Sequence, residues 1–293
     1  MGDFHGEQTS ILENQFLQLE YLANSARIIR FAPMGRPNMF ADMGTTPIST
    51  PYGNFYFRGG HRLWHSPESM PRTYIPDNEG AALSELPNGV RIEMPAESWT
   101  HIAKSIEIEL NPDQPQVILR HELRNEGAWA VEFAPWVLTM FRLGGVGIFP
   151  QPVGNVDATG LLSNRHIALW PYARVDDPRV MLRDDFVIVH ADSQLPPFKF
   201  GYFNRHGWIG YWLDGTFFVK RFEVGPETKP YPDGGCNAES YFNDQFLELE
   251  TLGPLTKLEP GESVFHAEIW EIYPELVSDL IPPEVQKIIQ PGE

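Results

Sequence analysis

The stretch Phe246-Leu-Glu-Leu-Glu-Thr-Leu-Gly-Pro254 decides the fold class, because its polar and apolar residues alternate as they do in a β-strand. Side chains of a strand point alternately to its two faces, so Glu248 and Glu250 share one face and lie about 6.5–7 Å apart along the strand. Two carboxylates that close repel each other, and they need water, a cation or a substrate that uses a base. Phe246 and Leu252 flank the pair on the same face, which is unusual for a plain solvent face. The pair therefore indicates a ligand site, with an exposed polar face as the alternative.

The bulk composition limits the classes of partner. The chain has 293 residues, enough for one large domain or two small ones, and 42% of them are hydrophobic, enough for a sizeable core. Its formal net charge is −17, from 39 acidic and 22 basic residues. This balance argues against nucleic acid and anionic membrane as the main partner, because both need a positive surface. We expect a neutral small molecule or an oligosaccharide, and the sequence leaves the oligomeric state open.

Cysteine usage and the N-terminus point to the cytoplasm. Cys236 is the only cysteine, which excludes an intrachain disulfide and a cysteine-based metal cluster. The N-terminal residues are acidic and lack the apolar segment of a secretory signal. No apolar run approaches the ~20 residues that span a bilayer. Neither a P-loop nor a dinucleotide-binding glycine loop occurs, so we expect no cofactor.

Short alternating runs punctuated by glycine and proline cover most of the chain, a pattern typical of all-β proteins. Residues 274–290 form the one segment predicted as a helix, and Asp214-Gly215 predicts a type I′ hairpin turn, whose positions need φ > 0. Residues 35–72 are predicted as a long loop, rich in glycine, proline and aromatic residues. Nothing resembles an interdomain linker, so we expect a single domain over residues 1–293. The strands are predicted at 11–22 (two strands and a turn), 26–31, 89–94, 102–110, 116–123, 130–141, 166–170, 186–190, 208–213, 216–222, 246–252 and 263–273.

The run Arg58-Gly-Gly-His-Arg-Leu-Trp-His-Ser-Pro-Glu68 concentrates groups that bind ligands or transfer protons. Its two glycines permit a close approach of the backbone to a ligand. Its side chains offer hydrogen-bond donors, candidate general acids and a carboxylate, from Arg58, Arg62, His61, His65 and Glu68. The spacing of His61 and His65 suits metal ligands on a helix, but the glycines and Pro67 disfavour a helix, so we expect no metal. A ligand-binding loop and a structural loop held by Arg–Glu pairs are both open interpretations.

The aromatic residues favour a carbohydrate ligand. The chain holds 8 Trp, 10 Tyr and 19 Phe, and Trp136, Trp170, Trp208 and Trp212 fall on predicted strands. Aromatic rings stack on the apolar faces of sugar rings, while carboxylates and amides bind the hydroxyl groups. Glu239 lies on the approach to the carboxylate strand and adds a further acid. Packing in the core is the alternative for any single tryptophan.

The order of these elements resembles the galactose mutarotase-like superfamily over nearly the whole chain. Aldose 1-epimerases of this superfamily carry their catalytic base in a late Leu-Glu-Thr strand, followed by a proline-bearing segment and a Pro-Gly turn. Leu249-Glu250-Thr251, Pro254 and Pro260-Gly261 match that pattern, and Gly59-Gly60-His61-Arg62 is similar in position to a sugar-binding Gly-Gly loop. The chain also resembles a largely uncharacterised branch of the superfamily, at residues 197–201, 207–208 and 218–222. The resemblance implies a large antiparallel β-supersandwich.

The resemblance also implies roles for single residues. Glu250 would take the proton of the anomeric hydroxyl. In true epimerases a histidine on a mid-chain strand is the acid, but here Trp136 stands at that position and cannot transfer the proton. We therefore expect His61 or His65 to protonate the ring oxygen. The substrate would be bound by Arg58, Arg62, Glu68, Trp136, Glu239 and Glu248.

Two other functions fit the same sequence. A glycoside hydrolase or lyase would use Glu248 and Glu250 as acid and base or nucleophile. A non-catalytic carbohydrate-binding protein would explain both the missing histidine and the abundant aromatic residues. The expected class is therefore an isomerase of aldose 1-epimerase type, with these two as alternatives.

Overall fold

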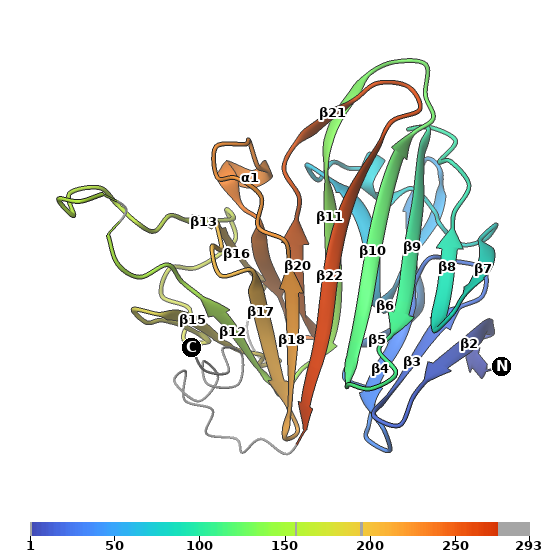
Figure 1. Ribbon diagram of the computed structural model, residues 1–293, viewed down its shortest axis with the longest axis horizontal. Helices are drawn as coiled ribbons and strands as arrows, with labels where there is room; N and C mark the ends of the chain where they lie inside the picture. Colours follow the sequence, from blue (N-terminus) through green and yellow to red (C-terminus); the bar gives the residue numbers. More distant parts are fainter. Residues whose placement is uncertain (1, 156, 194–195, 275–293) are drawn as a thin grey trace.

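The computed structural model describes residues 2–155, 157–193 and 196–274. These residues form two antiparallel β-sheets that pack face to face, with β22 crossing in front of β11 in Figure 1. The first sheet has 12 strands, ten of which follow the spatial order β1 (Gly2–Phe4), β2 (Glu7–Glu13), β3 (Leu17–Leu22), β4 (Ile28–Pro33), β6 (Gly53–Ser66), β11 (Val131–Arg142), β20 (Phe246–Leu252), β19 (Ala238–Phe242), β16 (Phe198–Tyr202) and β13 (Ile167–Leu169). The other two pair at the side: β5 (Asp42–Thr50) with β6, and β21 (Thr256–Leu258) with β11. The architecture confirms the predicted all-β supersandwich.

The second, 10-stranded sheet contributes the other layer. Its order is β14 (Val180–Leu182), β15 (Phe186–His190), β12 (Val146–Pro150), β17 (Trp208–Leu213), β18 (Thr216–Phe222), β22 (Ser263–Pro274), β10 (Gln116–Asn125), β9 (Ile102–Leu110), β8 (Gly89–Glu93) and β7 (Ala82–Leu86). In residues 2–155, 157–193 and 196–274, helical structure is limited to a 3-10 turn, η1 (Arg72–Tyr74), and one short turn, α1 (Pro232–Gly235). Within the described ranges, no helix has the length and apolar character needed to cross a membrane.

Most strands lie where the alternation predicts them. Five of them, β9, β15, β17, β18 and β20, have the predicted bounds. Asp214 and Gly215 both adopt positive φ, 50° and 77°, as the hairpin turn between β17 and β18 requires. The predicted helix at 274–290 lies outside the described residues apart from Pro274, which ends β22.

The prediction of a long loop over residues 35–72 is wrong. Most of this segment forms a hairpin of β5 and β6, and β6 is a 14-residue strand that pairs with both β4 and β11. From Arg58 to Ser66 every residue of β6 is buried, because material covers both faces of the strand there. A strand buried on both faces loses the polar–apolar alternation that makes it recognisable. The two adjacent glycines at positive φ interrupt the pattern further.

The space between the sheets is filled by one large apolar cluster. Trp270 of β22 packs edge-to-face against Phe31, Phe40 and Phe218, with ring centroids 5.3, 5.7 and 5.5 Å away. Leu247 and Leu249 of β20 belong to the same cluster. Because alternate residues of β20 point the other way, Glu248 and Glu250 face away from this core. The predicted division of β20 into two faces is therefore confirmed.

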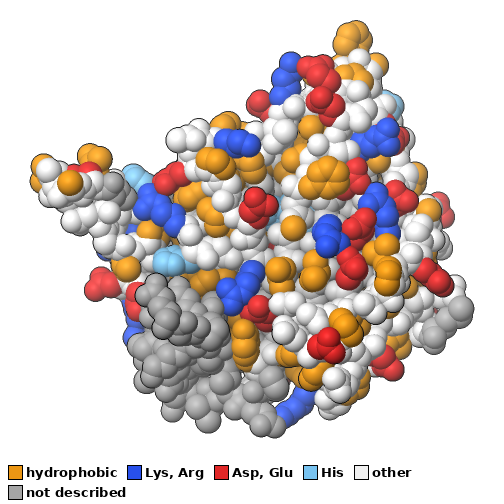
Figure 2. Space-filling view, in the orientation of Figure 1, with side chains coloured by type: hydrophobic (Ala, Val, Ile, Leu, Met, Phe, Trp, Pro, Cys, Tyr) orange, Lys and Arg blue, Asp and Glu red, His pale blue; other side chains and the backbone are white. Residues whose placement is uncertain are grey.

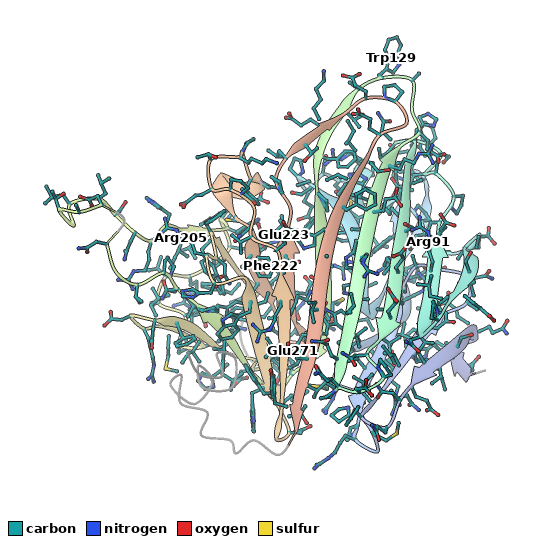
Figure 3. All side chains as sticks on the ribbon, viewed as in Figure 1. Arg91, Trp129, Arg205, Phe222, Glu223 and Glu271 are labelled. Atoms are coloured by element: carbon teal, nitrogen blue, oxygen red, sulfur yellow. The ribbon has the colours of Figure 1, made fainter. Side chains whose placement is uncertain are left out.

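The outer face of the second sheet carries a buried apolar cluster over β12, β15, β17 and β18, made of Ile148, Phe186, Ile188, Trp208, Phe217 and Val219. Its remaining part, over β8, β9, β10 and β22, is a charged solvent face. Charges of both signs are interspersed over it (Figure 2), and the side chains of Arg91 and Glu271 project from it (Figure 3). Arg91 pairs with Glu107 and Glu122, and Arg221 pairs with Glu271. Exposed pairs of this kind contribute little to stability.

Gly60 marks the closest approach of β6 to β4. Its φ is 62°, and a Cβ at this position would lie 2.0 Å from the backbone oxygen of Ile28. The left-handed backbone disfavours an L-residue by about 1–2 kcal/mol, and overpacking adds about 1–3 kcal/mol. We expect Gly60→Ala to lower the free energy of unfolding in urea by about 2–5 kcal/mol.

Gly35→Ala is the matched control for this prediction. Gly35 also has a positive φ, 73°, but nothing lies within 4 Å of an added Cβ. It should lose only the backbone contribution of about 1–2 kcal/mol. Equal losses in the two variants would show that the close approach to β4 is unimportant.

Candidate functional site

A pocket of about 620 Å³ opens on the outer face of the 12-stranded sheet, over β6, β11, β20 and β16. Its charged lining residues are Arg62, Glu68, Lys199 and Glu248. Its aromatic walls come from Phe57, Trp64, Tyr74, Trp136, Trp170 and Tyr172, joined by Tyr241 and Phe246. The volume lies within the range of about 300–1,000 Å³ that small-molecule sites occupy.

Glu250 lies in the sheet beneath this pocket, fully buried. Its Oε2 accepts hydrogen bonds from Trp136 Nε1 at 2.7 Å and from Lys199 Nζ at 2.9 Å. Its Oε1 is also buried, and it has no hydrogen-bond partner among the described residues. One oxygen of the carboxylate is therefore fixed by two donors, whereas the other has none among the described residues.

Lys199 of β16 connects two carboxylates of neighbouring strands. Its Nζ lies 2.7 Å from Glu239 Oε2, and it sits over the rings of Trp136 and Trp170, 4.7 Å from each centroid. Burial alone would lower the pKa of Lys199, but Glu250 and Glu239 outweigh burial and raise it well above its ordinary value. Lys199 is therefore a permanent cation in the wall of the pocket.

Burial has a different result for Glu239. It raises the pKa of Glu239 well above its ordinary value, against the attraction of Lys199, and the charge of Glu250 raises it further. Two carboxylates compete for one ammonium group, so one of them is favoured in the neutral form. The direction of this shift favours Glu239 as the neutral member of the group that it forms with Lys199 and Glu250.

Glu248 lines the pocket directly. It accepts a hydrogen bond from Arg62 Nη2 at 2.8 Å. Burial raises the pKa of Glu248, Arg62 opposes the rise, and the charge of Glu250 adds to it, so that the pKa reaches about 7. Glu248 and Glu250 are thus two carboxyl groups of one strand in unlike surroundings, Glu248 beside Arg62 at the pocket surface and Glu250 beneath it between Trp136 and Lys199.

Arg62 is held by stacking rather than by a full set of hydrogen bonds. Its guanidinium lies 4.2 Å from the ring centroid of Trp64 and 5.3 Å from that of Phe57. Its Nε and Nη1 are buried and have no hydrogen-bond partner among the described residues. These donors suit ligand hydroxyl groups, and at the rim the hydroxyl of Tyr74 donates to Glu68 at 2.5 Å.

The structure places His61 away from the pocket, on the opposite face of β6. Residues 61, 63 and 65 point between the sheets, whereas Arg62 and Trp64 point outward. His61 Nε2 lies 2.8 Å from His121 Nε2, and its Nδ1 lies 2.8 Å from Thr139 Oγ1. Burial lowers the pKa of His61 well below its ordinary value, so it stays neutral in the core.

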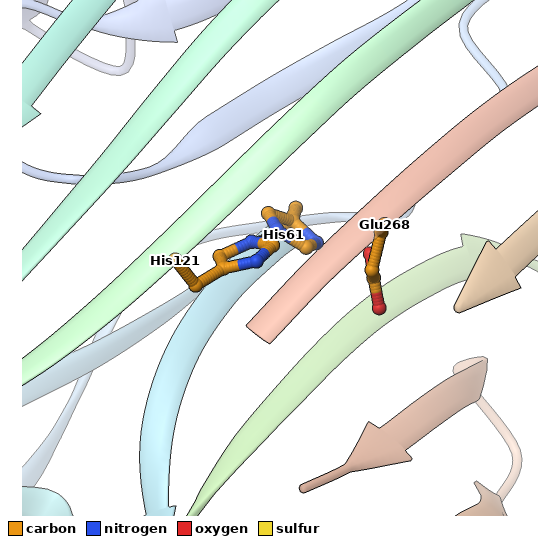
Figure 4. A group of neighbouring side chains, drawn as sticks. All are labelled: His61, His121 and Glu268. Atoms are coloured by element: carbon orange, nitrogen blue, oxygen red, sulfur yellow. Dashed lines mark hydrogen bonds between the residues drawn. The ribbon is translucent and has the colours of Figure 1, made fainter. Parts of the chain in front are cut away.

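The surroundings of His61 form a satisfied hydrogen-bond network. His121 Nδ1 donates to the backbone oxygen of His266, so its Nε2 accepts the proton of His61 Nε2. Ligand atoms of His61, His121 and Glu268 lie within 4.8 Å of one another (Figure 4). Lys220 Nζ lies 3.1 Å from Glu268 Oε1, and Trp270 Nε1 donates to Oε2. Because these donors already occupy the carboxylate, the group is better explained as a structural network than as a metal site.

The other predicted site residues divide between the pocket and the rest of the fold. Arg62, Glu68, Trp136 and Glu248 line the pocket, and Glu250 and Glu239 lie next to them. His65 points inward, with Nε2 3.4 Å from Glu97. Arg58 is buried on β6, where it pairs with Glu7 and donates to Asn78. The structure therefore does not bring either histidine, or Arg58, to Glu250.

Sequence reasoning missed Lys199. A lysine between Phe198 and Phe200 in a strand bounded by aromatic residues was a usable signal, because a buried charge needs a partner. Tyr172 and Tyr241 were not among the predicted site residues either. Their ring centroids lie 6.3 Å apart at the pocket rim. They belong to segments far apart in the chain, which only the folded sheet brings together.

Comparison with solved structures identifies the fold. A TPR-domain containing protein from Parabacteroides distasonis is 14% identical over 94% of this chain, with a TM-score of 0.62. A galactose mutarotase related enzyme from Lactobacillus acidophilus is 8% identical over 94% of this chain and 100% of its own, with a TM-score of 0.59. A protein from Escherichia coli K12, provisionally named an aldose 1-epimerase, is 15% identical over 92% of this chain and 100% of its own, with a TM-score of 0.55.

These likenesses show the galactose mutarotase-like fold, as the sequence predicts. The chain spans about half of the Parabacteroides protein, of which 49% is covered. No family model and no curated protein matches the chain. At identities this low the shared fold leaves the activity to be argued from the pocket.

Proposed function

We propose that the protein interconverts the anomers of an aldose in the pocket over β20 and β16. Ring opening needs a base for the proton of the anomeric hydroxyl and an acid for the ring oxygen. Glu250 is the base, acting through its unpartnered Oε1. Glu248 takes the role of the acid in place of the histidine, because His61 and His65 point to the opposite face.

The unlike environments of Glu248 and Glu250 carry this proposal. Two carboxyl groups in different surroundings, one able to donate a proton and one held as an acceptor, are typical of acid–base sites. Trp136 and Lys199 hold Glu250 as an acceptor, while Glu248 has a pKa of about 7. Arg62 and Lys199 then bind the sugar hydroxyls, and the aromatic walls stack on its apolar faces.

The direct test is exchange between α and β anomers, measured by saturation-transfer NMR on a panel of aldoses. Acceleration above the buffer rate for at least one aldose supports the proposal. No acceleration for any aldose, with the protein folded by circular dichroism, contradicts it. The specific sugar is the one with the highest kcat/KM in the panel.

The pH dependence of this activity follows from Glu248. The protonated form of Glu248 predominates below its pKa of about 7, and the acid must carry a proton to act. We expect kcat to fall tenfold per pH unit once the pH exceeds about 7, and Glu248→Gln to remove this limb. A flat profile from pH 6 to 9 in the wild type, once spontaneous exchange is subtracted, would exclude Glu248 as the acid.

Glycoside cleavage is the second candidate, because an acid and a base of this kind also serve hydrolases. Release of reducing ends from aryl glycosides or oligosaccharides, lost in Glu248→Gln, would favour it over anomer exchange. A third outcome, saturable sugar binding with neither reaction, would favour a non-catalytic binding protein.

A further inference from the structure

A second pocket, of about 420 Å³, adjoins the C-terminal end of β6. The two share the segment from β6 to η1: Trp64 and Tyr74 line the first pocket, whereas His65 and Arg72 line the second. Its other walls come from the β5–β6 turn, the loop before β9 and the start of β11. The function proposed above uses none of its residues.

An exposed aromatic surface forms one wall of this pocket. Trp99 is 64% exposed, and its ring lies 4.8 Å from that of Tyr52, centroid to centroid. The contact with Tyr52 holds the indole from one side and leaves apolar surface open to a ligand. A large exposed ring that is braced in this way suits stacking on an apolar, flat partner.

Two residues that line the pocket, His65 and Arg72, carry a hydrogen-bond acceptor and a donor that the described residues leave unsatisfied. His65 is 2% exposed, and its Nε2 faces Glu97 Oε2 at 3.4 Å, so Nδ1 is the acceptor. Burial lowers the pKa of His65, which keeps the ring neutral. Neither His65 Nδ1 nor Arg72 Nε has a hydrogen-bond partner among the described residues. Buried groups without partners are costly, and a ligand that satisfies them gains that free energy.

The charge of the lining selects against ions. Arg72 and Glu132 are its charged side chains of opposite sign, and behind them Glu97 pairs with Lys104. The pocket is therefore close to neutral. A purely apolar ligand would leave His65 and Arg72 unsatisfied, whereas each hydroxyl of a sugar is both donor and acceptor.

We propose that this pocket is a second carbohydrate-binding site, which takes a neutral pyranose ring stacked on Trp99 with hydroxyls at His65 and Arg72. The proposal is independent of the reaction assigned to the first pocket. A site of this kind would hold a further unit of a glycan, or a separate sugar, without transforming it. The pocket volume is enough for a small ligand of this class.

The test uses methyl glycosides of glucose, galactose, mannose and N-acetylglucosamine, which cannot open their rings. Protein labelled with 5-fluorotryptophan is titrated with each and followed by 19F NMR, with the Trp99 resonance assigned by Trp99→Phe. We expect a saturable shift of the Trp99 resonance with a millimolar dissociation constant for at least one glycoside. Arg72→Gln should weaken this binding by about tenfold, the loss of one charge-assisted hydrogen bond.

Trp129 supplies the matched control. It is 81% exposed in the loop before β11, at the top of Figure 3, and does not line the pocket. Its resonance should stay in place, and Trp129→Phe should bind as the wild type does. A Trp99 resonance that none of the glycosides moves overturns the proposal. So does unchanged affinity in Arg72→Gln, or a shift confined to Trp64, Trp136 and Trp170 of the first pocket.

Discussion

Glu250→Gln is expected to lower kcat for anomer exchange by about 100- to 10,000-fold, the usual contribution of a positioned base. The amide oxygen can still accept hydrogen bonds from Trp136 and Lys199, so the side chain should keep its place. What it loses is the ability to take a proton. KM should change little, because Arg62 and the aromatic walls remain. Saturation-transfer NMR on the best aldose of the panel measures both constants.

Two further variants separate proton transfer from indirect effects. Glu271→Gln removes a carboxylate from the outer face of the second sheet and should leave kcat unchanged. Glu239→Gln changes the other carboxyl beside Lys199, and its loss should be much smaller than that of Glu250→Gln. Equal losses in Glu239→Gln and Glu250→Gln would mean that the pocket needs a correctly held Lys199 rather than a base at Glu250. Full activity in Glu250→Gln would exclude it as the base.

The sequence predicts the part of the site that depends on local periodicity. Glu248 and Glu250 share a face because alternation in a strand has period 2, and that rule needs no knowledge of the partners. The flanking Phe246 and Leu252 correctly indicated a covered face, since both are buried outside the main core. The late strand also carried the resemblance to the fold that the solved structures show.

To predict the acid one must know that His61 and Arg62 lie in a strand, and the sequence pattern does not indicate this. His61 and Arg62 are adjacent, so in a loop both could reach one ligand, and residues 35–72 were predicted as a loop. In the β6 strand adjacent residues point to opposite faces, and only Arg62 reaches the pocket. The choice of His61 and His65 as candidate acids therefore rested on the incorrect prediction of a loop, because burial of β6 on both faces removed its alternation.

Lys199 shows the other limit of sequence reasoning. Its partners Glu239 and Glu250 lie 40 and 51 positions further along the chain, and they meet it through β19 and β20. A lysine in an apolar strand signals that a partner exists, but the strand order that supplies the partner depends on the whole sheet. The contact between Tyr172, which follows β13, and Tyr241 of β19 likewise depends on the strand order of the whole sheet.

Lys199→Met should cause the largest loss of stability among the site variants, about 3–5 kcal/mol in the free energy of unfolding. Methionine has a similar length, but it leaves Glu250 charged and without its ammonium partner in a fully buried position. Urea denaturation followed by circular dichroism at pH 7 measures the loss. A loss below about 1 kcal/mol would place the pair in the class of weak surface salt bridges.

A second substitution should restore the stability lost in Lys199→Met only if it removes the carboxyl group that carries the negative charge beside Lys199. Burial raises the pKa of Glu239 well above its ordinary value, which favours Glu239 as the neutral carboxyl beside Lys199. Adding Glu250→Gln to Lys199→Met should therefore restore most of the lost stability, whereas adding Glu239→Gln should restore little. Glu250→Gln alone should lose less than Lys199→Met, because Glu239, 2.7 Å from Nζ, can give up its proton and pair with the lysine. Better rescue by Glu239→Gln would reverse the assignment of the charged carboxylate, and with it the choice of Glu250 as the base.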